Sequence, residues 1–192
     1  MLKINRLFLL LLLILVLHQP VSKAQEIKLR SFSNIGGDFA LTNHLGGKTT
    51  LYQYRGKVVI LYFGYTFCPD ECPNTMFVMK DVLEQLEDSA DQIQILFITV
   101  DPERDTTKRL KEYMAIFDER FIGLRGDEKT TVLVARRYVT RYRKRLLDSS
   151  GTYIVDHSSY AFLIDQSGTI RYIFPFKTPP HMVVKAIKLL LD

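Results

Sequence analysis

The chain has 192 residues and a mass of 22.3 kDa, with 47% hydrophobic residues, 24% charged residues and a formal net charge of +5. This composition excludes a wholly disordered chain, because the apolar fraction is high and the net charge is small. The length fits one globular domain. Two cysteines are too few for a disulfide-dense scaffold or a four-cysteine zinc site.

Residues 1–24 have the three-part pattern of a secretory signal peptide. Lys3 and Arg6 precede an unbroken apolar run at 7–17, and the Ser-Lys-Ala of 22–24 offers a cleavage site. We expect a cleaved signal peptide at 1–24 and one domain at 25–192. The alternative is an uncleaved membrane anchor, for which the run is short against ~20 apolar residues. Export would place the domain in the periplasm or on the outer face of the inner membrane, where cysteines meet an oxidising environment.

The net charge of the expected mature domain is nearly balanced. The segment 1–24 carries three basic residues and no acidic residue, so its removal lowers the formal charge from +5 to +2. The basic pI of the whole chain is therefore no argument for nucleic-acid binding.

The predicted elements begin with a short hairpin that pairs residues 39–41 with residues 49–51. Residues 58–63 form a continuous apolar run, which is typical of a strand buried on both faces. The pattern then predicts a helix at 74–86, a second buried strand at 93–100, a helix from Thr106 or Thr107, a helix at 128–137, strands at 160–164 and 170–174, and a last helix opened by residues 178–180. This order predicts an α/β domain with a central mixed β-sheet flanked by helices and an N-terminal β-hairpin.

Cys68 and Cys72 lie between the first buried strand and the following helix, where thiols are activated by the helix N-terminus. Asp70 and Glu71 oppose that activation. Two thiolates at this spacing form a disulfide or converge on a soft metal ion such as Cu(I) or Zn(II). The residues alone leave open a metal site, a thiol–disulfide reductant, a peroxidase and a structural disulfide. The closure entropy of so short a loop makes a purely structural role the weaker interpretation.

A histidine could supply a third metal ligand. His18 falls within the predicted signal peptide, His44 lies in a glycine-rich turn, and His181 starts the last predicted helix. His157 precedes an apolar strand that could bring it across the sheet to the cysteine loop. Spacing alone favours an ordinary surface or structural role for such a residue.

Four segments, taken together, resemble the SCO/SenC family of copper-binding cytochrome c oxidase assembly proteins. They are Gly-Lys-Val-Val at 56–59 running into Phe-Gly-Tyr-Thr-Phe-Cys-Pro-Asp-Glu-Cys-Pro at 63–73, Val-Asp-Pro-Glu-Arg-Asp-Thr at 100–106, Phe-Ile-Gly-Leu at 121–124, and Val-Asp-His at 155–157 followed by Phe-Leu-Ile-Asp at 162–165 and Gly168. The resemblance implies a thioredoxin-like fold and one copper ion, Cu(I) or Cu(II), bound by Cys68, Cys72 and His157. It also implies a role for Asp101 beside the site, orienting a ligand; the alternative for Asp101 is helix capping or turn chemistry before Pro102.

The function implied by the resemblance is that of a copper chaperone for the dinuclear copper (CuA) centre of cytochrome c oxidase. The expected partners are the copper-bearing oxidase subunit and other copper carriers or thiol reductants. The alternative is a thiol–disulfide reductase that keeps the oxidase cysteines reduced, with Cys68 attacking, Cys72 resolving and His157 dispensable. Glu71 departs from the family pattern, which commonly has an apolar residue there.

Two further features have open interpretations. Residues 136–145 hold six basic residues, Arg136, Arg137, Arg141, Arg143, Lys144 and Arg145. We interpret them as a solvated helix end and strand, with a docking face for acidic partners or a membrane surface as the alternative. Tyr65 and Phe67 either shield the copper loop or pack in the core.

Overall fold

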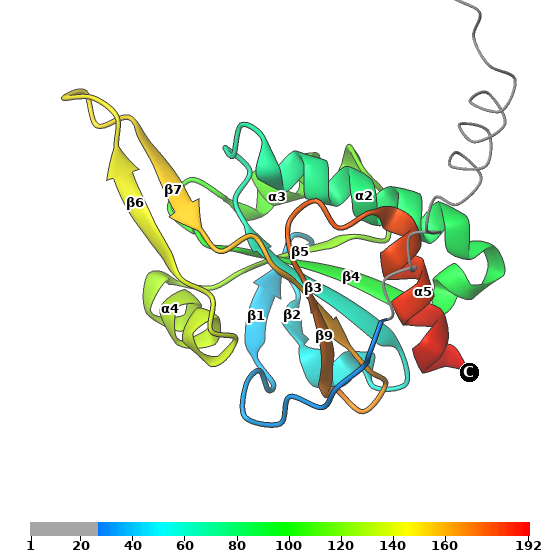
Figure 1. The fold of residues 1–192 in the computed structure, drawn as a ribbon. Helices are drawn as coiled ribbons and strands as arrows, with labels where there is room; N and C mark the ends of the chain where they lie inside the picture. The colour runs from blue at the N-terminus through cyan, green and yellow to red at the C-terminus, as the bar shows by residue number, and fades with distance from the viewer. Residues whose placement is uncertain (1–26) are drawn as a thin grey trace, which may run out of the picture.

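The computed structural model describes residues 27–192, so the predicted signal peptide at 1–24 lies outside the described residues. The strands of the main sheet are β1 (Ala40–Asn43), β2 (Lys48–Thr50), β3 (Val58–Gly64), β4 (Ile93–Thr99), β5 (Ile122–Arg125), β8 (Ala161–Ile164) and β9 (Ile170–Phe174). They form one seven-stranded sheet in the order β2-β1-β5-β4-β3-β8-β9 (Figure 1). From residue 27 onward, no helix is both long enough and apolar enough to cross a membrane.

The sheet is mixed because β3 and β4 run parallel to each other, as do β4 and β5, while β8 runs antiparallel to β3. Its four helices are α2 (Glu71–Leu86), α3 (Thr107–Ala115), α4 (Glu128–Arg137) and α5 (Pro180–Leu191). All seven residues of β3 are buried, which is the pattern of a central strand covered on both faces. The predicted α/β class, with a central mixed sheet and an N-terminal hairpin, is confirmed.

Alternation along β3 shows how both faces are covered. The Tyr62 ring lies against Phe97, whose ring contacts Tyr113 of α3. The Phe63 ring points the other way and contacts Tyr138, at the end of α4. Tyr62 therefore marks the sheet face covered by α2 and α3, and this face carries the cysteines.

Several boundaries differ from the sequence prediction. The helix expected at 74–86 begins at Glu71, so Cys72 lies inside its first turn rather than in the preceding loop. Pro73 is compatible with this start because the first turn of a helix needs no N–H donors. Residues 51–54 form a 3₁₀ turn capped by Thr50, where the end of a hairpin strand was expected. Phe77, an apolar residue of this helix, is exposed.

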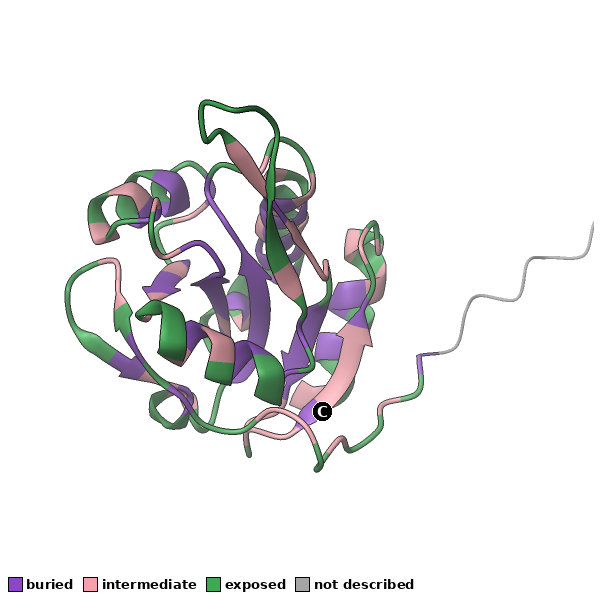
Figure 2. Cartoon of the chain, turned by 90° about the vertical axis from the view of Figure 1, so that its left-hand side faces the viewer, coloured by how far each residue is buried: buried purple, intermediate pink, exposed green. Residues whose placement is uncertain are grey.

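Two strands, β5 and β7 (Tyr153–His157), were not predicted, whereas β6 (Tyr142–Leu146) falls where a solvated strand was expected. β5 is short, lies between α3 and α4, and pairs with both β4 and β1. β6 and β7 form a separate antiparallel two-stranded sheet, here called the ribbon. The ribbon projects from the body of the domain (Figure 1), and Figure 2 shows it mostly exposed or intermediate while the central strands are buried.

Candidate metal centre

Cys68, Cys72 and His157 come together at the carboxyl end of β3. One ligand atom from each of the three residues lies within 4.8 Å of the other two, the only such cluster of three or more His, Cys, Asp or Glu residues in 27–192. His157 Nε2 lies 3.3 Å from Cys72 Sγ, and the Cys72 backbone N–H donates to Cys68 Sγ at 3.4 Å. The two thiols are free of a disulfide.

The other histidine candidates lie elsewhere. His44 Nδ1 accepts a hydrogen bond from the backbone N–H of Gly123 at 3.0 Å, which ties the end of β1 to β5. His181 is exposed at the start of α5. His44 thus has a structural partner, and among the histidines of 27–192 only His157 faces the cysteines.

Cys72 sits in a buried space that exists because residue 64 is glycine. A Cβ placed on Gly64 would lie 2.8 Å from Cys72 Sγ, from Phe97 Cε2 and from Tyr62 Cε1. The Tyr62 hydroxyl also donates to Cys72 Sγ at 3.8 Å. Both Gly64 and Tyr62 were missed as site residues by sequence reasoning, although the period of two in a strand would have placed them on one face.

The loop that carries Cys68 is held by a buried carboxylate, Asp105. It accepts hydrogen bonds from Thr66 N–H at 3.0 Å, from Thr66 Oγ1 at 2.7 Å and from Thr99 Oγ1 at 2.6 Å. Burial raises the pKa of Asp105. Sequence reasoning included Asp105 in a family segment but gave it no role.

His157 is oriented by its own backbone neighbourhood. Its Nδ1 lies 3.1 Å from the Ser158 carbonyl oxygen, and a carbonyl only accepts. Nδ1 therefore donates its proton to this carbonyl, and Nε2 faces the thiols, 3.3 Å from Cys72 Sγ. The Tyr65 ring meets His157 edge-on with centroids 5.8 Å apart. Tyr65 is buried and packs against the ligand, whereas Phe67 is exposed.

The two thiols have different acid strengths. The hydrogen bond with the Cys72 side chain, together with His157 and backbone N–H groups, lowers the pKa of Cys68 to about 4 despite partial burial. Burial raises the pKa of Cys72 well above its usual range, and the neighbouring Cys68 adds to that. The half-exposed Cys68 is thus the thiolate of the metal-free pair.

Asp101 does not touch the three ligands. Its buried carboxylate accepts hydrogen bonds from Arg104 Nε and from the Tyr153 hydroxyl, the latter at 2.9 Å. Tyr153 belongs to β7, the strand that ends in His157. The Asp101 side chain caps no helix, since α3 is capped by Thr106.

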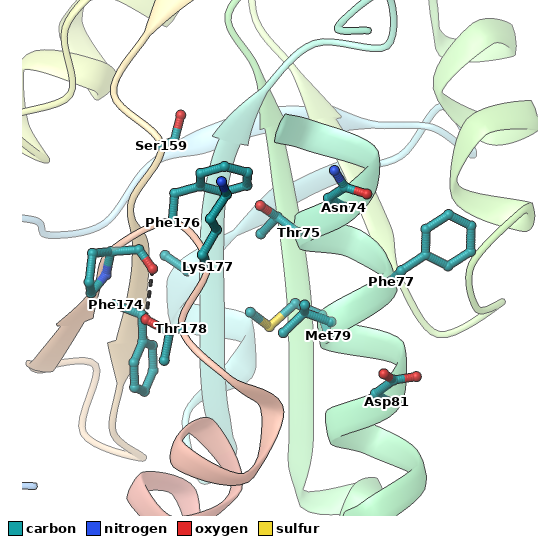
Figure 3. A pocket seen from close by; sticks show the side chains of 13 residues that line it. Asn74, Thr75, Phe77, Met79, Asp81, Ser159, Phe174, Phe176, Lys177 and Thr178 are labelled. Atoms are coloured by element: carbon teal, nitrogen blue, oxygen red, sulfur yellow. Dashed lines mark hydrogen bonds between the residues drawn. The ribbon is translucent and has the colours of Figure 1, made fainter. Parts of the chain in front are cut away.

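The ligands open into a pocket of about 310 Å³, lined by Cys68, Pro69, Asp70, Glu71, Val155, Asp156 and His157. Glu71 bridges the two sides of this opening by accepting a hydrogen bond from Ser159. A larger and more apolar groove of about 370 Å³ lies between α2 and the loop that follows β9, with Phe77, Met79 and Phe176 along it (Figure 3). It contains none of the three ligands.

The basic residues at 136–145 fall on the end of α4 and on β6, as a solvated helix end and strand. Several are paired with acids: Arg143 and Arg145 with Asp156, and Lys144 with Glu103. Their exposure agrees with the simpler of the two interpretations.

The donor set fits a copper ion. Two thiolates are soft ligands suited to Cu(I), and an imidazole nitrogen extends the site toward Cu(II). Hard cations, which require several oxygen ligands, do not match these donors.

Comparisons with known proteins agree with this chemistry. The SCO1/SenC family matches residues 27–192. A SCO2-like protein of Rickettsia felis is 36% identical over 155 residues, covering 80% of this chain and 76% of the relative. The crystal structure of Arabidopsis thaliana ScoI with copper bound superposes with a TM-score of 0.76 at 31% identity, covering 82% of this chain and 98% of that chain.

Bradyrhizobium japonicum ScoI with copper bound gives a TM-score of 0.75 at 35% identity, covering 81% of this chain and 99% of that chain. These structures share the thioredoxin-like architecture expected from the resemblance. On the family match over 27–192 and the identity to its relatives, this chain belongs to the SCO1/SenC family.

Proposed function

We propose that this chain is a copper-binding assembly factor for the dinuclear copper centre of cytochrome c oxidase, with Cys68, Cys72 and His157 as its copper ligands. The observation that carries the proposal is the approach of these three donor atoms to within 4.8 Å of one another. Membership of the SCO1/SenC family and the copper bound in the Arabidopsis and Bradyrhizobium structures support it.

Each ligand has a distinct task in this proposal. The Cys68 and Cys72 thiolates hold Cu(I), and binding releases the proton of Cys72. The His157 imidazole adds the nitrogen donor that lets the same site hold Cu(II). Transfer proceeds by ligand exchange: bonds from copper to these sulfurs break as bonds to acceptor thiolates form, and no electron moves. The pocket beside Cys68 and His157 gives an acceptor access to the ion.

A copper titration tests the proposal. Cu(I) and Cu(II) are added separately to the reduced domain and to His157→Ala, Cys68→Ala and Cys72→Ala variants, and thiolate–copper charge-transfer absorption is followed. We expect one equivalent of either ion in the native protein, loss of Cu(II) in His157→Ala, and loss of both ions in the cysteine variants. Absence of tight copper binding in the native protein would refute the proposal.

A second candidate function, thiol–disulfide reduction, is favoured by the low pKa of Cys68, about 4. In that reaction the Cys68 thiolate attacks a target disulfide and forms a mixed disulfide. Cys72 then displaces the target thiol, so two electrons pass to the target and a Cys68–Cys72 disulfide remains. His157→Ala separates the two functions, because it removes Cu(II) binding and spares reductase turnover.

The proposed acceptor is the copper-bearing subunit of the oxidase, and the proposed location is the periplasm or the outer face of the inner membrane. The pattern of residues 1–24 supports a signal peptide, with the domain at 25–192. The mass of the exported protein tests cleavage after Ala24.

Replacement of Arg141, Arg143 and Arg145 by Gln tests docking of the basic segment to acidic partners or anionic vesicles. Unchanged binding would refute docking through this segment.

A further inference from the structure

The ribbon that carries His157 is separate from the sheet that carries the cysteines. Within 27–192, β6 and β7 pair only with each other, while β3, which leads to Cys68, is a central strand of the seven-stranded sheet. An isolated two-stranded ribbon is at best marginally stable in water. The position of His157 relative to Cys72 therefore depends on contacts that fasten the ribbon to the body of the domain.

Val155 of β7 is buried in the core, and the polar contacts of the ribbon converge on residues 101–104, here called the platform, which follow β4. Arg104 Nη1 donates to the Tyr153 carbonyl oxygen at 2.9 Å, and the Tyr153 hydroxyl donates to Asp101 at 2.9 Å. Lys144 of β6 forms an ion pair with Glu103. Both strands of the ribbon are thus attached to one four-residue segment, and Tyr153 shares its strand with His157.

Arg104 is the centre of the platform. Its Nε donates to the buried Asp101 carboxylate, and its guanidinium lies 3.6 Å from the centroid of the Tyr153 ring. The same guanidinium lies 4.8 Å from the Phe67 ring centroid, and Phe67 precedes Cys68. Arg104 therefore contacts the cysteine loop and the histidine strand at once. A planar guanidinium can donate in its plane while it stacks on rings above and below, which a lysine cannot do.

We propose that Arg104 is a positioning residue that determines whether the site accepts Cu(II). It fixes β7 through Tyr153, and this fixes His157 Nε2 beside Cys72. With the ribbon loosened, the two thiolates remain in the loop after β3 and in α2, so the protein keeps its Cu(I) ligands and loses its nitrogen donor. This inference rests on the proposed copper function, and it assigns to Arg104 the ability of the site to bind Cu(II) as well as Cu(I).

The chain contains a matched control. The Arg109 guanidinium also stacks on Phe67, 4.9 Å from the ring centroid, but its Nε donates to Thr66 Oγ1 on the cysteine side. Arg104→Gln and Arg109→Gln thus remove the same charge from the same aromatic ring. Only the first removes a bond to the ribbon. Gln at 104 still offers Asp101 a hydrogen-bond donor, which limits the penalty of leaving that buried carboxylate unpaired.

The test compares Cu(II) and Cu(I) affinities, each measured by competition with a chromophoric chelator. We expect Arg104→Gln to weaken Cu(II) binding about tenfold or more, the usual cost of removing a group that orients a metal ligand. Cu(I) affinity should change less than about threefold, and Arg109→Gln should leave both affinities near native. A parallel loss of both ions in Arg104→Gln, or no loss of either, would overturn the proposal.

A metal-free measurement separates this inference from the copper function. Backbone hydrogen exchange of 142–157 should be about tenfold faster in metal-free Arg104→Gln than in Arg109→Gln, because local opening of the ribbon becomes easier. Unchanged exchange would overturn the positioning role, whatever the copper results. A native protein that binds no copper would refute the proposed function, and the exchange comparison would still decide whether Arg104 holds the ribbon. Tyr153→Phe, which removes only the hydroxyl bond to Asp101, is a milder second variant with the same expected direction.

Discussion

The cysteine half and the histidine half of the metal centre belong to different parts of the molecule. Cys72 lies in the first turn of α2 with no exposed surface, against a fully buried strand. His157 ends β7, a half-buried strand outside the main sheet. The fold fixes the sulfur donors by close packing and the nitrogen donor by the polar contacts of the ribbon and the burial of Val155. A site divided in this way can change its coordination without disturbing the core.

The largest contrast is expected inside the cysteine half. With its pKa lowered to about 4, Cys68 is already a thiolate at neutral pH. Its alkylation by iodoacetamide in the metal-free protein should hardly change between pH 8 and pH 6, where an ordinary thiol slows roughly a hundredfold. Cys72, with a raised pKa and no exposure, should stay unmodified. Mass spectrometry of proteolytic peptides measures the extent of alkylation at Cys68 and at Cys72.

The same experiment in urea is its control, because unfolding removes the environment of both thiols. Both cysteines should then react with the ordinary pH dependence. If folded Cys68 slows in proportion to acidity between pH 8 and pH 6, the assigned cause, hydrogen bonding from Cys72 and His157, is wrong.

Gly64→Ala should displace Cys72 and destabilise the packing around the cysteine ligands. The added Cβ would stand 2.8 Å from Cys72 Sγ and from two aromatic ring atoms in a fully packed region. Overpacking of this kind costs about 1–3 kcal/mol, and displacement of the sulfur should weaken Cu(I) and Cu(II) binding together. Urea unfolding and copper competition measure the two effects. Gly47→Ala is the control, because a Cβ there meets only the Asn43 side chain in an exposed turn; equal losses in both variants would contradict the packing argument.

The sequence predicted the cysteine half more completely than the histidine half, for a physical reason. Apolar runs rich in β-branched and aromatic residues, as at β3 and β4, are typical of buried strands, so they placed Cys68 and Cys72 at a strand–helix junction. β6 reads Tyr-Arg-Lys-Arg-Leu, with no alternation of apolar residues, because none of its residues is buried and all but Tyr142 are exposed. Without β6 nothing in the spacing places His157 opposite Cys72, and only the family resemblance selected it.

The supporting residues show the same division. Gly64 and Tyr62 follow from alternation along β3 once Cys72 is known to face that side. Arg104 and Asp101 act through tertiary contacts to Tyr153, 49 and 52 residues away in sequence. No local pattern encodes such a contact.

Asp105→Asn should change the pH dependence of stability on the cysteine side. Burial raises the folded-state pKa of Asp105, and the nearby Asp101 carboxylate adds to the shift. Folding therefore favours the protonated form. The stabilisation from protonated Asp105 is complete below the pKa of the unfolded state, ~3.9. It is lost as the pH rises through the raised pKa of the folded state. Asn resembles the protonated carboxyl group and does not ionise, so the stability of Asp105→Asn should not fall in this way as the pH rises.

Urea unfolding midpoints across that pH range test the sign. Relative to the native protein, Asp105→Asn should gain stability as the pH rises from 4 toward neutrality. An opposite trend would mean that the three donors from Thr66 and Thr99 stabilise the ionised carboxylate more than burial penalises it.

The smallest effect is expected where the two halves touch directly. Glu71 accepts a hydrogen bond from Ser159, two residues beyond His157. Glu71→Leu should remove this link and cost about 1 kcal/mol of stability, with a modest increase in the rate of Cu(II) release and little change in Cu(I). Ser159→Ala should have the same effect, and the double variant should cost no more than either single one, because all three lack the same bond. Additive losses would show that Glu71 and Ser159 act independently, leaving the platform as the main connection between the ribbon and the cysteines.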